Sequence, residues 1–492
     1  ASYIDDFETT SNKIDISNPK EWTISSVPST FPEAALNNDE RSGYNRARLA
    51  WYYIDPLFTR RSSSLTPGHI KGDLNQLSDD NVREVYKTEL FPNKKINYRE
   101  SSTLNVLNLA YYPDERGPYN LDRNLTNRGK LTAPEKRWGG MMRKIDQNDF
   151  EASNVQYIEF WLMDPFVKAK REGKSFSGEL YFNLGERSED ILKYGKKFYE
   201  SGMPVDGASS LYTETLWGKV PNQNSVTYAF NTGKGVRQLQ DVGYNGLTSA
   251  EEREYGIYKQ FLNDVRARVD ADVFNDIEKS PSADLYHYFR GRDYDEAKLS
   301  ILDRYKYINN PNGNSADADE SPENYSTAYK NTPDAEDINQ DYKLNEYEKY
   351  YQYRISIDPT RMQVGDNYIV DTRTAYPTRR NGSQDEVTWY LFRIPVENYE
   401  KNVGVISDFS SVRFMRLFLT GFSEPVVLRL GTLNLVSGEW RTYEQSLYAG
   451  RTADQSGTLE PSSVSFEENN EKTPVNYIPP PGISRVIDPG QD

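Results

Sequence analysis

The chain has 492 residues, which is enough for roughly two to four domains of ordinary size. Hydrophobic residues make up only 36% and aromatic residues 13%, with 37 tyrosines, which favours broad β-surfaces over a large aliphatic core. The 59 basic and 74 acidic residues give a net charge of −15, which argues against nucleic acid as a general partner.

Cysteine and histidine limit the chemistry further. The chain has no cysteine, so neither a disulfide framework nor a thiolate metal site can form. It has two histidines, far apart in sequence, so a zinc site or a histidine-based catalytic triad would need other residues. We find no signal peptide and no run of about 18 apolar residues, and both ends resemble cuts inside a longer polypeptide.

Strands are predicted throughout residues 1–186. In NVQYIEFWLMDPF (154–166) apolar side chains alternate along one face, and the same alternation follows in GELYFNLG (178–185). Two such strands need a second sheet to cover their apolar face. Further strands are predicted at residues 3–8, 21–25, 46–54, 103–112 and from 138 to 145.

Residues 187–385 are predicted to be an inserted helical and loop region. Thr248 and Glu251 have the spacing of a capping box, and an apolar stripe at helical spacing follows from Tyr258 to Val265. His287 lies among aromatic residues and is expected to be packed rather than catalytic. His69 lies in a polar segment and is expected to be solvated.

An acidic stretch at residues 337–348 has the spacing of a calcium loop. Oxygen ligands would come from positions 1, 3, 5, 7, 9 and 12, and residues 347–355 could form the exiting helix. The sixth position is Tyr342 instead of the usual glycine, which strains or widens the turn. The alternative is a solvated acidic linker, and any bound Ca²⁺ is expected to be structural. The predicted ligands are Asp337, Asn339, Asp341, Lys343 through its carbonyl, Asn345 and Glu348.

The β pattern returns in residues 386–445. Strands are predicted at 388–395, 412–419 and 426–436. In the last strand, the alternation that includes Leu428 and Leu430 is out of step with the alternation that includes Leu433 and Leu435. A β-bulge is therefore expected between the two pairs. Residues 446–492 are rich in Ser, Thr, Glu and Pro and are predicted to be an extended linker.

The order of these segments predicts a mainly β fold, a galactose-binding-like jelly-roll sandwich split by a long α/loop insertion. Its two parts are residues 1–186 and 386–445, because each part alone lacks a partner for its apolar face. Two separate sandwiches are the alternative architecture.

An enzymatic function has little support in the sequence. Asp5 and Asp6 are adjacent on a predicted strand, so their side chains point to opposite faces and cannot act together as acid and base. No nucleophile elbow, zinc-protease motif or phosphate loop is present in the sequence. We therefore expect a protein that is not an enzyme.

Long motifs across nearly the whole chain resemble the SprA/Sov family, giant outer-membrane proteins of the Bacteroidetes type IX secretion system that are tied to gliding motility in some species. Besides the acidic loop, the motifs are YIDDFE (3–8), ERGPYN (115–120), RWGGMMRKID (137–146), DFEASNVQYIEFWLMDPF (149–166), GELYFNLGERSEDIL (178–192), QDVGYNGL (240–247), DLYHYFRGRDYD (284–295), LDRYKYINNPNGNS (302–315), VRFMRLFLTGF (412–422), LRLGTLNLVSGEWR (428–441) and VNYIPPPGI (475–483).

The resemblance implies a very large β-barrel through which folded cargo crosses the outer membrane. Its implied partners are the rest of the translocon barrel, PorV-like shuttle and plug proteins, and secreted cargo with type IX targeting domains. Evenly spaced amphipathic strands of about ten residues are not apparent here, so we expect a soluble domain of that protein instead of its wall. The expected location is an extracellular cap or loop, and the alternative is the periplasm.

Two other functions remain open from the sequence. A carbohydrate-binding module of a cell-surface protein is suggested by the sandwich and its many aromatic residues. A glycosidase is disfavoured, since no carboxylate pair can be placed.

Overall fold

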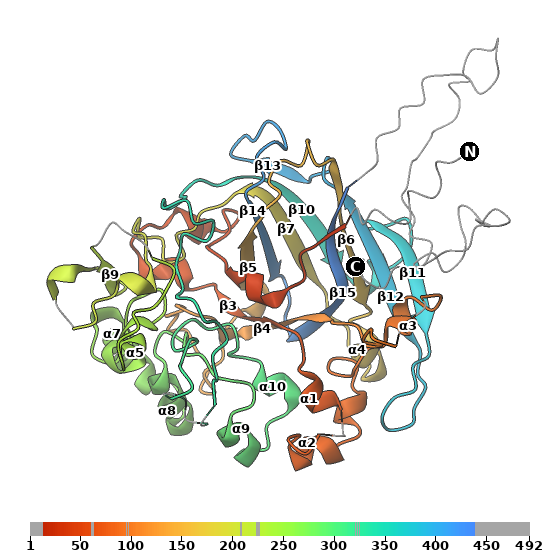
Figure 1. The fold of residues 1–492 in the computed structure, drawn as a ribbon, viewed down its shortest axis with the longest axis horizontal. Helices are drawn as coiled ribbons and strands as arrows, with labels where there is room; N and C mark the ends of the chain where they lie inside the picture. Colours follow the sequence, from red (N-terminus) through yellow and green to blue (C-terminus); the bar gives the residue numbers. More distant parts are fainter. Residues whose placement is uncertain are drawn as a thin grey trace, which may run out of the picture.

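Two antiparallel sheets lie face to face in the computed structural model, which describes residues 13–437 apart from 61–62, 95, 97, 207–208, 223–226, 320, 322 and 324 (Figure 1). Sheet A has the order β11-β12-β6-β15-β4-β3, with β1 also paired to β15, and sheet B has the order β13-β10-β7-β14-β5-β2. The strands are β1 (Lys13–Asp15), β2 (Thr23–Ile24), β3 (Ala47–Tyr52), β4 (Leu107–Arg116), β5 (Trp138–Lys144), β6 (Val155–Met163), β7 (Gly178–Glu186), β10 (Lys349–Ile357), β11 (Ile369–Ala375), β12 (Val387–Pro395), β13 (Lys401–Val403), β14 (Phe414–Thr420) and β15 (Val426–Ser437).

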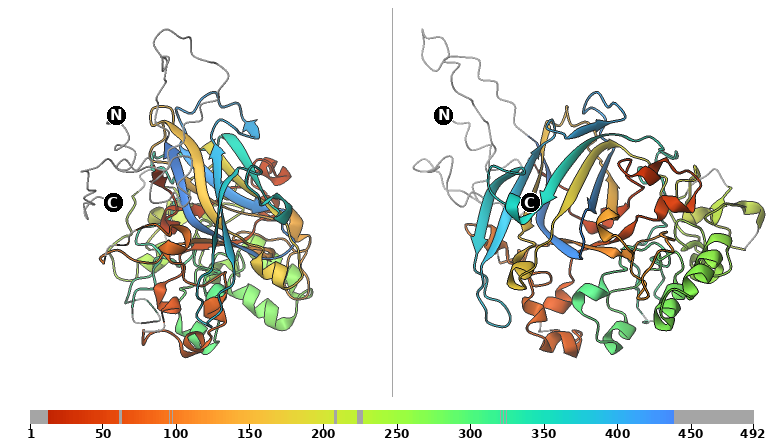
Figure 2. Two further views of the ribbon diagram at one scale, coloured as in Figure 1. Left: turned by 90° about the vertical axis from the view of Figure 1, so that its right-hand side faces the viewer. Right: turned by 180° about the vertical axis from the view of Figure 1, so that it is seen from behind.

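Short helices and one small hairpin make up the regular structure outside the two sheets. The hairpin pairs β8 (Tyr212–Glu214) with β9 (Lys219–Pro221). The helices α5 to α10 lie beside and below the sheets in Figure 1, and Figure 2 shows the same grouping from two other sides. The helices are α1 (Pro56–Thr59), α2 (Gly68–Gly72), α3 (Lys87–Leu90), α4 (Val167–Arg171), α5 (Arg237–Gln240), α6 (Ser249–Glu252), α7 (Gly256–Arg266), α8 (Ala271–Lys279), α9 (Arg292–Glu296) and α10 (Ile301–Arg304).

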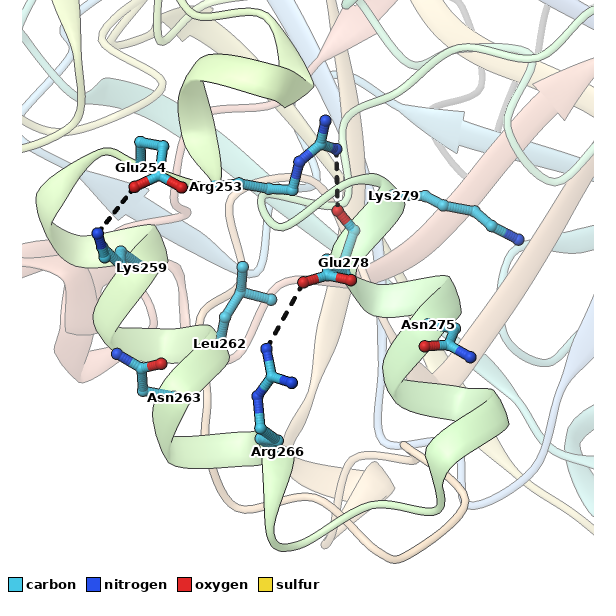
Figure 3. A pocket seen from close by; sticks show the side chains of 9 residues that line it. All are labelled: Arg253, Glu254, Lys259, Leu262, Asn263, Arg266, Asn275, Glu278 and Lys279. Carbon is cyan, nitrogen blue, oxygen red and sulfur yellow. Dashed lines mark hydrogen bonds and ion pairs between the residues drawn. The ribbon is translucent and has the colours of Figure 1, made fainter.

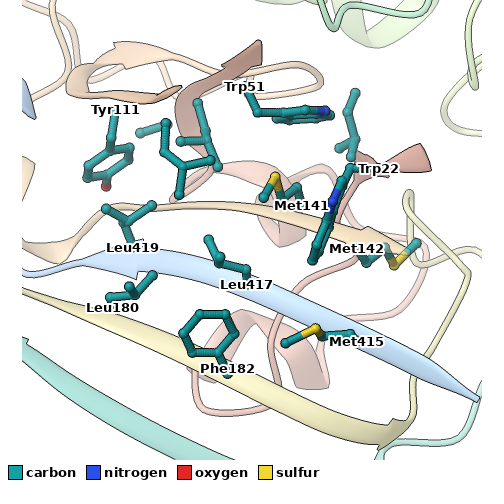
Figure 4. Close-up of a cluster of buried hydrophobic side chains, with 14 of the residues drawn as sticks. Trp22, Trp51, Tyr111, Met141, Met142, Leu180, Phe182, Met415, Leu417 and Leu419 are labelled. Carbon is teal, nitrogen blue, oxygen red and sulfur yellow. The ribbon is translucent and has the colours of Figure 1, made fainter. Parts of the chain in front are cut away.

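The core lies between the two sheets, as alternation along the strands predicted. Ile158, Phe160 and Leu162 of β6 are fully buried and belong to the same cluster as the inward residues of β7. The rings of Phe160 and Phe182 meet across the sheets with centroids 5.6 Å apart. Figure 4 shows apolar side chains from β5, β7 and β14 gathered in this cluster with Trp22, Trp51 and Tyr111. The predicted mainly β class is confirmed.

Sheet A is buried on both faces. One outer cluster packs residues such as Phe58 and Tyr305 against Tyr52 and Ala110, and another packs Leu90 against the outward residues of β6 and β12. This double burial explains why β3 is buried along its whole length instead of alternating with polar residues.

Strands far apart in the sequence are neighbours in both sheets. In sheet A, β15 lies between β4 and β6, and in sheet B, β14 lies between β5 and β7. The strands of residues 13–186 therefore share ladders with those of residues 387–437 and are not a sandwich of their own. The galactose-binding-like jelly roll stays a prediction, supported by this interleaved order.

The predicted insertion needs a correction at its C-terminal end. Residues 187–385 contain β10 and β11, which pair with β7 and β12 inside the two sheets. The segment predicted as an exiting helix, 347–355, is mostly strand β10, because Tyr351, Tyr353 and Ile355 alternate into the core. The predicted strand 3–8 and the predicted linker 446–492 lie outside the described residues.

The predicted capped helix is two helices. Thr248 forms the expected capping box with Glu251, but it caps only α6. The apolar stripe belongs to α7, whose Tyr258, Phe261 and Val265 are fully buried. None of the helices in the described ranges is both long and apolar enough to cross a membrane.

Candidate functional site

The acidic loop 337–348 folds around the first of its predicted ligands, Asp337. This side chain is only 1% exposed. Its Oδ1 accepts the N–H of Asp341 at 3.1 Å, and its Oδ2 accepts the N–H of Tyr342 at 2.8 Å and the hydroxyl of Tyr228 at 3.0 Å. Tyr342 has a φ of +67°, so the turn that calcium loops make with glycine is made here by a tyrosine.

Glu348, the predicted twelfth ligand, faces Arg416 of β14. Its Oε1 accepts from Arg416 Nη2 at 2.7 Å and from the backbone N–H of Ser188 at 3.1 Å. Arg416 is fully buried and also donates to the hydroxyls of Ser25 and Ser26 at 2.9 and 2.8 Å. Glu348 therefore neutralises a buried guanidinium on the outer face of sheet B.

The other predicted ligands are bonded within the loop or to its neighbours. Asn339 donates to Asp341 at 3.2 Å, and Asp341 accepts the N–H of Lys343 at 2.9 Å. The Asn345 amide donates to the carbonyl of Arg187 at 2.6 Å. The side chain of Lys343 is exposed.

These contacts do not fit the predicted calcium site. Both Asp337 oxygens accept hydrogen bonds from N–H or O–H groups, and the Glu348 carboxylate is held by Arg416. Within the described ranges, no three Asp, Glu or His side chains are grouped so that they could hold a metal ion. The structure thus brings Asp337, Asn339 and Asp341 together in a hydrogen-bonded turn. Glu348 lies outside this turn, against Arg416.

Sequence reasoning missed a set of buried carboxylates that accept backbone N–H groups from loops. Burial raises the pKa of Glu189 to about 8, and it raises the pKa values of Glu336 and Glu200 as well. Such carboxylates accept hydrogen bonds from backbone N–H groups that are not paired within a helix or a strand. Glu189 accepts from Ile338 and Asn345, Glu336 from Ile191 and Phe198, and Glu200 from Asp334 and Gly243, at 2.6–3.2 Å.

A pocket of about 520 Å³ lies beside Asp337, where the edge of sheet B meets the segment before the acidic loop. We call it the seam pocket. Its aromatic residues are Trp22, Tyr228, Tyr244 and Tyr329, from β2 and its flank and from three loops. The full lining consists of residues 20–23, 143, 144, 146, 228, 244, 329–335, 337, 338 and 340.

A second hollow, about 470 Å³ in volume, lies between α7 and α8 (Figure 3). Arg253 donates to the backbone carbonyl of Glu278 at 3.4 Å, and Arg266 lies 3.6 Å from the Glu278 carboxylate. Lys259 pairs with Glu254 at 2.8 Å. These charged side chains are largely exposed, so the hollow resembles a solvated surface groove.

Both histidines pack within the fold. His69 Nε2 lies 3.1 Å from the carbonyl oxygen of Leu299, so His69 is less solvated than predicted. His287 stacks on Tyr294 with centroids 3.7 Å apart, and its Nε2 lies 2.7 Å from Asp293. The expected packing of His287 is confirmed.

Comparison with known proteins gives a family match for part of the chain. Residues 260–492 match the SprA amino-terminal family model, which is described as a motility related/secretion protein. No curated protein matches the chain. The matched region begins in α7, includes the acidic loop and covers β10 to β15. Together with the motifs in the sequence, this match supports membership of the chain in the SprA family of motility-related secretion proteins.

Proposed function

We propose that this chain is a non-enzymatic, soluble domain of the outer-membrane type IX protein-secretion pore. In this proposal it lies on the extracellular face, shapes or caps the pore, and contacts partner proteins. The partners would be the rest of the translocon, PorV-like shuttle and plug proteins, and cargo with type IX targeting domains. The observation that carries the proposal is the family match over residues 260–492.

The turn after β13 supports a role in protein contact. Val405 is 86% exposed and has a φ of +56°, a conformation that is unfavourable for a β-branched residue. We take this strained backbone position, with its exposed apolar side chain, as a candidate contact point. Figure 1 shows this turn protruding from the end of the sandwich.

A cysteine-labelling experiment on whole cells tests the location. Because these 492 residues contain no cysteine, Val405→Cys adds one defined, exposed thiol to this part of the protein, and any cysteine elsewhere in the complete protein is replaced by serine in this variant and in its control. A membrane-impermeant maleimide should label it on intact cells. The matched control is Ala50→Cys, at a fully buried position, which should stay unlabelled. Labelling of Val405→Cys only after permeabilisation of the outer membrane would instead favour the periplasm.

The alternative function, a carbohydrate-binding module, finds no support on the outer face of sheet B. Phe31 packs on Phe418 and Trp138 with ring centroids 5.9 Å away in each case. Arg416 is covered by Ser25 and Ser26. The chain's own loop thus occupies the face where an extended sugar chain would lie.

A further inference from the structure

The seam pocket is lined by four basic and four acidic residues, so its lining carries no net charge, and all of them except Lys20 and Asp337 are arranged in ion pairs. A charged ligand would have to displace one member of a pair and leave the other without a partner, which is costly where the side chains are buried. Arg143 and Asp334 are both largely buried. The pairs are Arg143 with Glu21 at 2.5 Å, Lys144 with Asp146 at 3.3 Å, and Lys330 with Asp334.

Apart from the exposed Lys20, the polar groups left for a ligand are uncharged. Asn331, Thr332 and Gln340 line the pocket, are exposed, and make no side-chain hydrogen bond to the described residues. Tyr228 donates its hydroxyl proton to Asp337 at 3.0 Å, so its oxygen remains an acceptor. Tyr329 does the same toward the carbonyl of Pro19 at 3.1 Å. The pocket therefore offers amides, hydroxyls and partly exposed aromatic rings.

A lining with no net charge and mainly uncharged free groups favours a neutral ligand that is rich in hydroxyl groups. Sugar hydroxyls both donate and accept, so they match amide and hydroxyl side chains, and the C–H face of a sugar ring packs on tyrosine. A volume of about 520 Å³ is within the range of sites that enclose small ligands. We propose that the seam pocket binds a short, neutral oligosaccharide of two or three rings, a site separate from the protein contacts of the proposed secretion function.

Ligand-observed NMR on the full chain tests this inference. The probes are maltotriose, cellotriose, chitotriose and mannotriose, each added alone. We expect at least one to bind with a Kd of about 1 mM or tighter. Tyr228→Ala should weaken that binding at least tenfold, since it removes the exposed ring. Asn331→Ala combined with Gln340→Ala should weaken it at least fivefold while leaving the tyrosines in place.

Two controls separate the pocket from general effects. Tyr347→Ala removes a ring that is 71% exposed outside the pocket, and it should leave the Kd unchanged. Tyr228→Phe keeps the ring and should retain binding within about threefold. The Kd should also stay constant between 0.05 and 0.5 M NaCl, because a neutral ligand is not screened.

Three results would overturn the inference. The first is that none of the four trisaccharides binds below 10 mM. The second is that a trisaccharide binds the wild type and the Asn331→Ala/Gln340→Ala variant with equal affinity. The third is that the sugar is displaced only by a charged peptide whose affinity falls steeply with salt. The last result would assign the pocket to a protein partner. Circular dichroism of each variant establishes that lost binding is not lost folding.

Discussion

At the scale of single residues, Glu348 and Arg416 form a buried ion pair between the acidic loop and sheet B. The Arg416 side chain is fully buried and that of Glu348 is 17% exposed. Arg187, also fully buried, stacks on Tyr350 nearby, and the Arg416 charge lowers the pKa of Arg187 further below the value that burial alone would give. Glu348 therefore pairs directly with Arg416, and its charge also favours the buried Arg187 cation.

Glu348→Ala should lower the free energy of unfolding by about 3 kcal/mol, because it leaves Arg416 buried and unpaired. Urea denaturation followed by tryptophan fluorescence measures this. Glu346→Ala, at an exposed position in the same loop, should change the free energy by less than about 0.5 kcal/mol. The difference in unfolding free energy between the two variants should be the same in Ca²⁺ and in EDTA. A loss of stability in Glu348→Ala that occurs only with Ca²⁺ would support the calcium-loop prediction instead.

The buried carboxylates predict a pH dependence of stability. Burial raises the pKa of Glu189 to about 8 and that of Asp241 to about 7, from ordinary values near 4. The folded state therefore holds these protons more tightly than the unfolded state does. Their contribution is fully present below pH 4 and is lost as the pH rises through 7 to 8.

We expect the free energy of unfolding to fall by more than about 1 kcal/mol between pH 5 and pH 8.5. Glu189→Gln should make this fall shallower, because glutamine cannot lose a proton. Denaturant titrations at four pH values compare the two slopes. Equal slopes in wild type and Glu189→Gln would show that Glu189 does not titrate in this range.

At the scale of elements, the bulge in β15 depends on Gly431. Pairing with β6 shifts register between Leu430 and Thr432, which confirms the predicted bulge. A Cβ at Gly431 would lie 3.0 Å from the Trp389 ring and 3.1 Å from Leu90. The bulge therefore brings the backbone against the outer cluster of sheet A.

Gly431→Ala should destabilise the protein by about 1–3 kcal/mol through overpacking. Gly256→Ala is the matched comparison, since a Cβ at the start of α7 would meet nothing within 4 Å. It should stabilise by up to about 1 kcal/mol, because alanine favours the helix. Thermal unfolding of both variants gives the two shifts, and a loss of stability in Gly256→Ala equal to that in Gly431→Ala would contradict the role of packing.

Strands with strict alternation could be predicted from the sequence, as β6, β7 and the bulged β15 show. Strand β10 could not, because the calcium-loop spacing suggested a helix directly after the loop, and β-pairing with β7 overrides that local pattern. The candidate site was harder still. The sequence does not distinguish a buried glutamate such as Glu189 from a solvated one. Its role becomes visible only when the loops that pack over it are in place.

At the scale of the whole molecule, the segments between the sheet strands cover the sandwich. Side chains from Tyr286 to Ile308 pack on the outer side of β3 and β4, and Val85, Leu90, Phe91, Leu104 and Val106 pack on the outer side of β6 and β12. The seam pocket lies where sheet B meets another such segment. The sites of this protein thus depend on strands from both ends of the chain forming shared sheets.

A disulfide across β7 and β14 tests that dependence most directly. Glu179 and Thr420 are paired residues on the outer face of sheet B, on strands predicted to belong to different parts of the chain. Paired residues in antiparallel strands have Cα atoms about 4.5–5.5 Å apart, a distance that suits a disulfide. The Glu179→Cys/Thr420→Cys variant, otherwise free of cysteine, should lose both free thiols on mild oxidation and migrate faster on a non-reducing gel. Two thiols that remain reactive in the folded, oxidised protein would contradict the shared sheet.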